Sequence, residues 1–289
     1  MAERTIETPN VTFRALEEGS GPLVLCLHGF PDDARSWRHQ IGAIVDAGFR
    51  VVAPFMRGYA PTSQPADGRF DALALGEDVV ALLEALGEED AVVMGHDWGA
   101  AATYFGALLS SRRMRKLVTL AVPYGPSFFR ALRESYVQQR RSWYMLFFQH
   151  ALAEEALARD DFAMVEHLYR DWSPGWKVPR AALQAVKETF GRPGTLQAAL
   201  GYYRHTMRPV FDDPAQLDTM LQTMTVPVQV PTLYLHGADD GCIGRELTDG
   251  MEAYFPRGLR VVIVPGTGHF LHQEKPDAVN PMILEFLAS

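Results

Sequence analysis

The sequence has little cysteine and no pattern typical of a metal site. Only two cysteines occur among 289 residues, Cys26 inside an apolar run and Cys242 in a turn. Neither belongs to a Cys-x-x-Cys pair, and no spacing of cysteine and histidine matches that of zinc ligands. We therefore expect two free thiols and no bound metal.

The sequence also lacks a long apolar run and an excess of positive charge. No stretch approaches the roughly 20 apolar residues that cross a bilayer, and the first residues, MAERTIETPN, lack the basic and then apolar form of a secretion signal. Lys and Arg number 27 against 35 Asp and Glu, so the composition favours neither nucleic acid nor an anionic membrane as a partner. We expect a cytoplasmic protein that binds a small uncharged ligand.

The sequence does contain a series of short apolar runs bounded by Gly, Pro or Asp. Continuous apolar runs of this length are typical of strands buried on both faces, as in a parallel sheet. The predicted strands are Leu23 to Leu27, Arg50 to Pro54, Ala91 to Met94, Lys116 to Val122, Thr232 to His236 and Leu259 to Val264.

Helical patterns separate these strands, among them residues 73–86 and 100–109. Such alternation predicts right-handed βαβ units and an α/β fold, with a mostly parallel sheet flanked by helices. Residues 5–16 alternate in the manner of a hairpin, which we expect at one edge of the sheet.

The alternation breaks between residues 123 and 225, where strands disappear and aromatic helical segments follow, such as residues 142–157 and a Pro/Gly-broken loop at 171–176. We expect a core made of residues 1–123 and 225–289, with an inserted helical lid at residues 124–224.

The segment Gly95-His96-Asp97-Trp98-Gly99 directly follows a predicted buried strand. A nucleophile on such a sheet sits on a tight turn between strand and helix, which requires small residues two positions before and two after it. Gly95 and Gly99 occupy those positions, and the following helix would direct its N–H groups at negative charge. The string alone is equally typical of an ordinary turn. Its position between a strand and a small-residue helix start favours Asp97 as a nucleophile.

A carboxylate nucleophile differs from serine in the substrates it attacks. It needs no base to remove a proton, and it displaces at a saturated carbon to leave an alkyl ester. Substrates with a strained ring oxygen or a halide suit this chemistry. The ester must then be cleaved by water, which requires a general base and a site for the oxyanion.

The base is expected to be a histidine after the last strand. His269 is the first histidine beyond that strand, after Pro265-Gly266-Thr267-Gly268, and His272 is the nearest rival, more suited to a structural role. His28 and His96 lie in turns beside the predicted site, where hydrogen bonding to the backbone is the usual role.

An acid must orient that base, and the strand ending at His236 runs into Asp239 and Asp240. We favour Asp240 as the acceptor of the His269 N–H, with Asp239 as the alternative. The oxyanion site should combine the N–H of Trp98, after the nucleophile, with that of Phe30 in the turn after an early strand. An ordinary strand exit is the other interpretation of the Phe30 segment.

With Asp97, Asp240 and His269 in this order, the chain resembles the epoxide hydrolases of the α/β-hydrolase superfamily. The resemblance covers nearly the whole chain and depends on the segments His28-Gly29-Phe30-Pro31, Arg57-Gly58-Tyr59, Gly95-His96-Asp97-Trp98-Gly99 and Gly268-His269-Phe270. It implies an α/β-hydrolase fold and the hydrolysis of an epoxide to a vicinal diol, with water as the other reactant and no cofactor. Phe55 departs from the superfamily pattern, in which a carboxylate often precedes the Arg-Gly segment.

The same resemblance implies two lid tyrosines that hydrogen-bond the oxygen of the epoxide ring. Tyr144 lies in a segment similar to the first, and Gly201-Tyr202-Tyr203-Arg204 is similar to the second. We assign Tyr203 rather than Tyr202, because the family residue directly precedes the arginine-like position. The lid is rich in Met and aromatic residues, which indicates a hydrophobic gorge. The expected substrate contacts are Phe30, Trp98, Trp143 and Phe147.

Two other functions compete with epoxide hydrolysis. A haloalkane dehalogenase would share Asp97 and His269 and hold the halide with indole N–H groups, for which Trp98 is suited. Many dehalogenases, however, have an asparagine at the position of Phe30, and a halide does not require two tyrosines. A non-catalytic binding protein on the same scaffold is less favoured, because such a protein would be expected to lack one of the three catalytic groups.

Overall fold

The protein forms one eight-stranded sheet in the computed structural model, which describes residues 1–289. The strand order is β1-β2-β4-β3-β5-β6-β7-β8. The strands from β4 to β8 in this order run parallel, and the β1–β2 hairpin adds two antiparallel strands at one edge. The strands are β1 Ala2–Glu7, β2 Thr12–Gly19, β3 Leu23–Leu27, β4 Arg50–Pro54, β5 Ala91–His96, β6 Met114–Leu120, β7 Thr232–Gly237 and β8 Leu259–Val264.

The six predicted strands and the edge hairpin are thus confirmed. Three of the six strands have identical bounds and the other three are shifted by one or two residues at one or both ends, while the hairpin spans residues 2–19 instead of 5–16. Every residue of β3 and β5 is buried, as expected for central strands with helices on both faces. β5 lies between β3 and β6, so the turn after β5 projects from the middle of the sheet.

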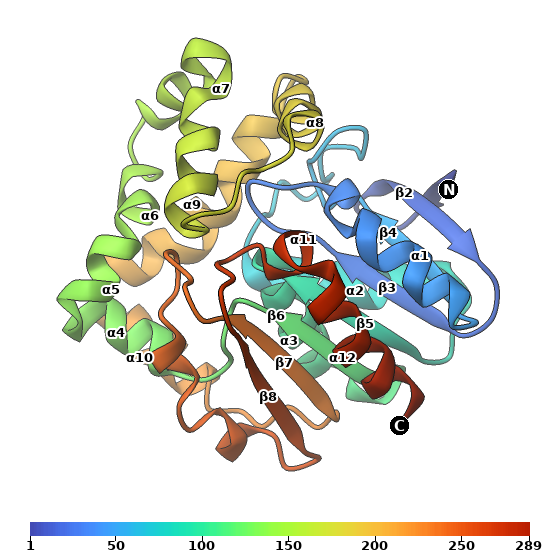
Figure 1. Ribbon diagram of the computed structural model, residues 1–289. Helices are drawn as coiled ribbons and strands as arrows, with labels where there is room; N and C mark the ends of the chain where they lie inside the picture. Colours follow the sequence, from blue (N-terminus) through green and yellow to red (C-terminus); the bar gives the residue numbers. More distant parts are fainter.

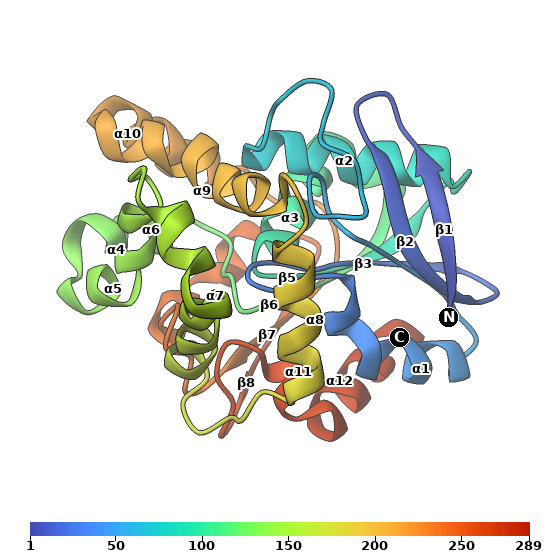
Figure 2. The same ribbon diagram turned by 90° about the horizontal axis from the view of Figure 1, so that it is seen from above.

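Helices cover both faces of the sheet. α1, α11 and α12 lie on one face and α2 and α3 on the other (Figure 2). The helices of these two layers are α1 Arg38–Asp46, α2 Ala72–Ala85, α3 Trp98–Ser110, α11 Leu271–Glu274 and α12 Pro276–Ala288. None of the helices in the chain combines the length and the apolar composition needed to cross a membrane.

Helix α2 shows how the sequence determines these elements. The Asp71 side chain caps its first turn by accepting a hydrogen bond from the N–H of Ala74 at 3.0 Å. Leu75, Val79 and Leu82 then recur at helical spacing and are buried, so the apolar stripe packs against the sheet and α3.

Between β6 and β7 the chain contains seven helices and no strand, which confirms that strands disappear in the segment predicted as the lid. These helices gather over one end of the sheet (Figure 1). They are α4 Ser127–Glu134, α5 Tyr136–Arg141, α6 Trp143–Phe147, α7 Ala153–Trp172, α8 Arg180–Phe190, α9 Thr195–Asp212 and α10 Pro214–Thr223.

Two details of the lid differ from the prediction. The helical pattern of residues 142–157 is interrupted after Phe147, because two arginines of α9 bind the carbonyls that follow: Arg204 donates to Phe148 O at 2.9 Å and Arg208 to Gln149 O at 2.6 Å. The predicted loop at 171–176 begins only at Ser173, since α7 continues through Trp172.

Candidate active site

Asp97 lies on a strained turn between β5 and α3. Its φ of 53° and ψ of −120° are rarely adopted by residues other than glycine and cost on the order of 1–3 kcal/mol. A Cβ atom on Gly95 would collide with the carbonyl of Gly99, and one on Gly99 with the carbonyl of Leu27. The turn therefore requires both glycines, as the sequence predicted, and it directs Asp97 away from the sheet.

A third glycine completes this turn. A Cβ atom on Gly29 would collide with the Asp97 side chain, so Gly29 allows the loop after β3 to approach the carboxylate. In that loop the N–H of Phe30 donates a hydrogen bond to Oδ1 of Asp97 at 2.7 Å. The pairing of Leu27 with Gly95 in neighbouring strands brings the two loops together. The sequence alone left the role of the Gly29 segment open.

His269 and Asp240 form a buried pair beside Asp97. Nδ1 of His269 lies 2.9 Å from Oδ2 of Asp240, and Oδ1 of Asp240 accepts the N–H groups of Cys242 at 2.7 Å and Ile243 at 2.9 Å. Asp239 is exposed and Asp240 buried, so of the two aspartates Asp240 meets the histidine.

On its other side, Nε2 of His269 lies 3.4 Å from Oδ2 of Asp97 and makes no hydrogen bond. Burial alone would lower the pKa of His269, but the charge and hydrogen bond of Asp240, followed by the neighbouring carboxylate of Asp97, raise it to about 10. Burial alone would raise the pKa of Asp240, but the charge and hydrogen bond of His269 outweigh it, so this pKa is lowered. The resting pair is therefore an imidazolium and a carboxylate at neutral pH.

The predicted tyrosines come from two lid helices. The rings of Tyr144 in α6 and Tyr203 in α9 have their centroids 5.7 Å apart. The hydroxyl of Tyr203 has no hydrogen-bond partner, whereas that of Tyr144 lies 3.2 Å from Sγ of Cys242. Burial raises the pKa of both hydroxyls well above the ordinary value, and the charge of Asp97 adds to the effect. Both remain protonated and able to donate.

Tyr202 points elsewhere. Its hydroxyl donates to the carbonyl of Arg57 at 2.9 Å, so it contributes no free donor near Asp97. The choice of Tyr203 over Tyr202 agrees with this geometry.

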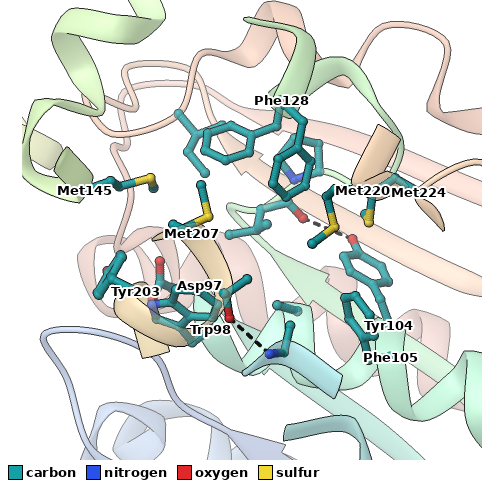
Figure 3. A pocket seen from close by; sticks show the side chains of 17 residues that line it. Asp97, Trp98, Tyr104, Phe105, Phe128, Met145, Tyr203, Met207, Met220 and Met224 are labelled. Carbon is teal, nitrogen blue, oxygen red and sulfur yellow. Dashed lines mark hydrogen bonds between the residues drawn. The ribbon is translucent and has the colours of Figure 1, made fainter. Parts of the chain in front are cut away.

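An apolar cavity of about 690 Å³ of empty space, its open mouth included, begins at Asp97. Asp97, Trp98 and Tyr203 lie together at one end of it, and the rest of its wall is almost entirely hydrophobic (Figure 3). The labelled residues of that wall are Tyr104, Phe105, Phe128, Met145, Met207, Met220 and Met224.

Two of the expected substrate contacts, Trp143 and Phe147, do not line this cavity. Trp143 is 43% exposed and packs on Phe147, four residues further along α6. Tyr144 and Phe148, the residue that follows α6, are also four residues apart and pack against Tyr203. Phe30 is buried against Tyr203 rather than in the cavity wall, and Trp98 does line the cavity.

The methionines of the cavity wall were not assigned individually from the sequence. Met220 and Met224 are four residues apart, so helical spacing would have placed them on one face. Nothing in the sequence, however, indicated which face of the lid meets Asp97.

The remaining histidines near the site have structural contacts. Nε2 of His28 accepts the N–H of Met56 at 2.9 Å, and Nε2 of His96 lies 2.9 Å from the carbonyl of His269. Both bind the backbone, as predicted. The rival His272 is buried, and its ring lies 4.8 Å from that of Trp37, which fits a packing role.

Two groups of side chains place three potential metal-binding atoms within 4.8 Å of one another. The first group is Asp240, Cys242 and His269, of which His269 and Asp240 are already paired with each other. The second group is Asp32, His96 and His272. In it, both carboxylate oxygens of Asp32 accept hydrogen bonds, from Tyr169 at 2.6 Å and Gln273 at 2.7 Å.

Comparison with known proteins agrees with this architecture. The model of the alpha/beta hydrolase fold family matches residues 22–276. The chain is 31% identical to epoxide hydrolase A of Mycobacterium tuberculosis over 99% of this chain and 97% of the relative. It is 30% identical to human epoxide hydrolase 4 over 94% of this chain and 74% of the relative.

Solved structures give the same result. The crystal structure of Bacillus megaterium epoxide hydrolase in complex with an inhibitor superimposes with a TM-score of 0.87 at 29% identity, over 99% of this chain and 100% of that chain. The structure of epoxide hydrolase A from Mycobacterium thermoresistibile gives a TM-score of 0.83 at 29% identity, over 100% and 98% of the two chains. The protein described here therefore belongs to the epoxide hydrolase family of the α/β-hydrolase superfamily.

Proposed function

We propose that this enzyme converts an epoxide and water to a vicinal diol through an ester on Asp97. One observation carries the proposal. Tyr144 and Tyr203, both buried and protonated, lie on the lid side of Asp97, and the other neighbour of Asp97 is the His269–Asp240 pair. A carboxylate can open an epoxide ring only if the departing oxygen is stabilised, and hydroxyl donors supply that stabilisation.

In the first step, Tyr144 and Tyr203 hydrogen-bond the ring oxygen and Asp97 attacks a ring carbon. Oδ1 of Asp97 already accepts the N–H of Phe30, so Oδ2 is the oxygen available for attack. The Oδ2–carbon bond forms while the ring carbon–oxygen bond breaks, and the ring oxygen gains a proton by way of the tyrosines. Oδ1 becomes the carbonyl oxygen of the ester.

In the second step, water attacks the carbonyl carbon of this ester. Esterification removes the Asp97 charge that helps to raise the pKa of His269, so the imidazolium gives up its proton more readily and the neutral imidazole can act as the base. The proton that His269 loses balances the one gained by the ring oxygen. The oxyanion then forms on Oδ1, which already accepts the N–H of Phe30, and the N–H of Trp98, the first residue of α3, is the second proposed donor. When the oxyanion collapses, the bond between the carbonyl carbon and Oδ2 breaks. The leaving oxygen takes the remaining proton of the attacking water and departs in the diol, while Asp97 is again a carboxylate and His269, which took the other proton, an imidazolium.

The substrate that best fits the cavity is a small, uncharged and hydrophobic epoxide. Apart from Asp97, the cavity wall contains no charged side chain, so it offers no counterion to a charged group elsewhere on the substrate. Flexible methionine side chains adapt to substrates of different shape.

Haloalkane dehalogenation remains the alternative because the indole Nε1 of Trp98 is buried without a hydrogen-bond partner and lies beside the cavity. Two indole or amide donors are expected for a halide, and no second tryptophan lines the cavity. This difference favours the epoxide.

A side-by-side assay with styrene oxide and 1-bromobutane distinguishes the two activities. We expect diol from the epoxide and no bromide release from the bromoalkane, with diol formation lost in Asp97→Ala. Bromide release without diol formation would establish the dehalogenase instead, and neither product would favour a binding protein.

A further inference from the structure

The thiol of Cys242 lies beside the active site but has no part in the mechanism above. Cys242 follows Asp240 by two residues in the loop after β7, and it is buried. Its Sγ atom lies 3.2 Å from the hydroxyl oxygen of Tyr144, while its N–H donates to Oδ1 of Asp240 at 2.7 Å. One residue thus contacts both the orienting acid and one of the lid tyrosines.

The backbone of Cys242 is fixed by the lid as well as by the core. Gln138 of α5, a buried side chain, donates from Nε2 to the carbonyl of Cys242 at 2.9 Å. Its Oε1 accepts the N–H of Gly244 at 3.1 Å. The loop is therefore held between Asp240 and Gln138, and the position of the thiol relative to Tyr144 is well determined.

The thiol remains protonated in this environment. Burial, followed by the charges of Asp240 and Asp97, raises the pKa of Cys242 well above its ordinary value. A protonated thiol is a poor nucleophile but retains an S–H that can donate a weak hydrogen bond. Sulfur is also a weak acceptor, so a hydroxyl that donates a hydrogen bond to it can readily donate to a better acceptor instead.

We propose that Cys242 is a positioning residue for ring opening, acting through Tyr144. In the resting enzyme the sulfur keeps the Tyr144 hydroxyl in place. When that hydroxyl donates to the ring oxygen, the S–H of Cys242 donates to the tyrosine oxygen and stabilises the negative charge that builds there. No bond to sulfur forms or breaks. The inference rests on the proposed function, since it assigns a role within the first of its two steps.

The two tyrosines are then not equivalent. Tyr144 is supported by the thiol, whereas Tyr203 has no partner for its hydroxyl. Removing the S–H should weaken the donor strength of Tyr144 and leave that of Tyr203 unchanged.

Single-turnover kinetics with styrene oxide test the proposal, because they separate ester formation from ester hydrolysis. We expect Cys242→Ala to slow ester formation by about tenfold, the effect of losing one hydrogen bond to a developing charge, and to leave ester hydrolysis unchanged. Cys242→Val, which fills the space but lacks the donor, should behave in the same way. Cys242→Ser should restore ester formation, because a hydroxyl also donates.

A merely structural role gives a different pattern. If Cys242 acted by maintaining the loop that carries Asp240, the variants would slow ester hydrolysis, and that result would overturn the proposal. The proposal would also be overturned if ester formation were unchanged in both Cys242→Ala and Cys242→Val.

Combination with tyrosine variants identifies the partner of the thiol. Adding Cys242→Ala to Tyr144→Phe should cause no further loss, while adding it to Tyr203→Phe should cause the full loss. Equal losses in both backgrounds would contradict the assignment to Tyr144. Failure of the wild-type enzyme to form any diol would refute the proposed function itself, whereas diol formation with an unaffected Cys242→Ala refutes only the role of the thiol.

Discussion

Nε2 of His269 lies 3.4 Å from Oδ2 of Asp97, on the side of the ring opposite the 2.9 Å contact of Nδ1 with Asp240. One imidazole is thus placed between two buried carboxylates. This arrangement favours the imidazolium in the resting enzyme, and it makes the pKa of His269 depend on whether Asp97 carries its charge.

Removal of the base should trap the ester. His269→Gln keeps a side chain of similar size but cannot deprotonate water, so ring opening by Asp97 should proceed while hydrolysis stalls. Intact-mass spectrometry after mixing with an epoxide should then show a protein heavier by the mass of that epoxide. The same measurement on the variant that also carries Asp97→Ala should show no adduct. An unmodified mass in His269→Gln at every time point would count against the two-step scheme.

The titration of His269 should respond to the charge of Asp97. Asp97→Asn removes that charge in the same way as esterification, so the pKa of His269 should fall below the value of about 10 in the wild-type enzyme. In the wild-type ester, hydrolysis should accordingly decline as the pH drops through this lower pKa, because a protonated imidazole is not a base. NMR of the imidazole nitrogens measures the shift, with the signal assigned by its loss in His269→Gln. An identical midpoint in the wild-type enzyme and in the Asp97→Asn variant would disprove the coupling.

The lid tyrosines should be essential together. We expect Tyr144→Phe combined with Tyr203→Phe to lower the rate of ester formation by about 10²- to 10⁴-fold, the range for positioned proton donors. Tyr202→Phe is the matched control, because its hydroxyl binds the carbonyl of Arg57. That variant should lose about 1 kcal/mol of stability and keep its rate of ester formation. A rapid double variant would show that the ring oxygen is stabilised elsewhere.

The turn at Asp97 should tolerate no side chain at Gly95. Gly95→Ala places a Cβ against the carbonyl of Gly99 and should lower the free energy of unfolding by at least about 2 kcal/mol. Gly42→Ala in the exposed part of α1, where an added Cβ meets nothing within 4 Å, should instead raise it by about 0.5–1 kcal/mol. Urea denaturation of both variants makes the comparison, and equal stabilities would contradict the packing argument.

Much of the fold and of the site follows from the sequence because the nucleophile, the acid and the base each lie in a loop or turn that follows a strand. Parallel strands place their carboxyl ends at one edge of the sheet. Asp97 after β5, Asp240 after β7 and His269 after β8 must therefore meet there. The strands themselves were predictable, since runs buried on both faces carry a strong apolar signal.

The lid was less predictable because its contacts come from distant parts of the chain. Helix α6 ends where arginines of α9 bind the carbonyls after it, and that end fixes which side chains of α6 face Tyr203. A rotation of α6 by one residue would turn Trp143 instead of Tyr144 toward Tyr203. The contact of Cys242 with Tyr144 likewise joins residues that no local pattern relates.

The covalent role of Asp97 is tested most directly by one turnover in H₂¹⁸O with enzyme in excess over styrene oxide. If Asp97 forms the ester and water attacks its carbonyl carbon, the first diol contains no ¹⁸O from the solvent, and the label appears in the peptide that carries Asp97. Direct attack of water on the epoxide would give a labelled diol and an unlabelled Asp97 peptide, which would contradict the mechanism.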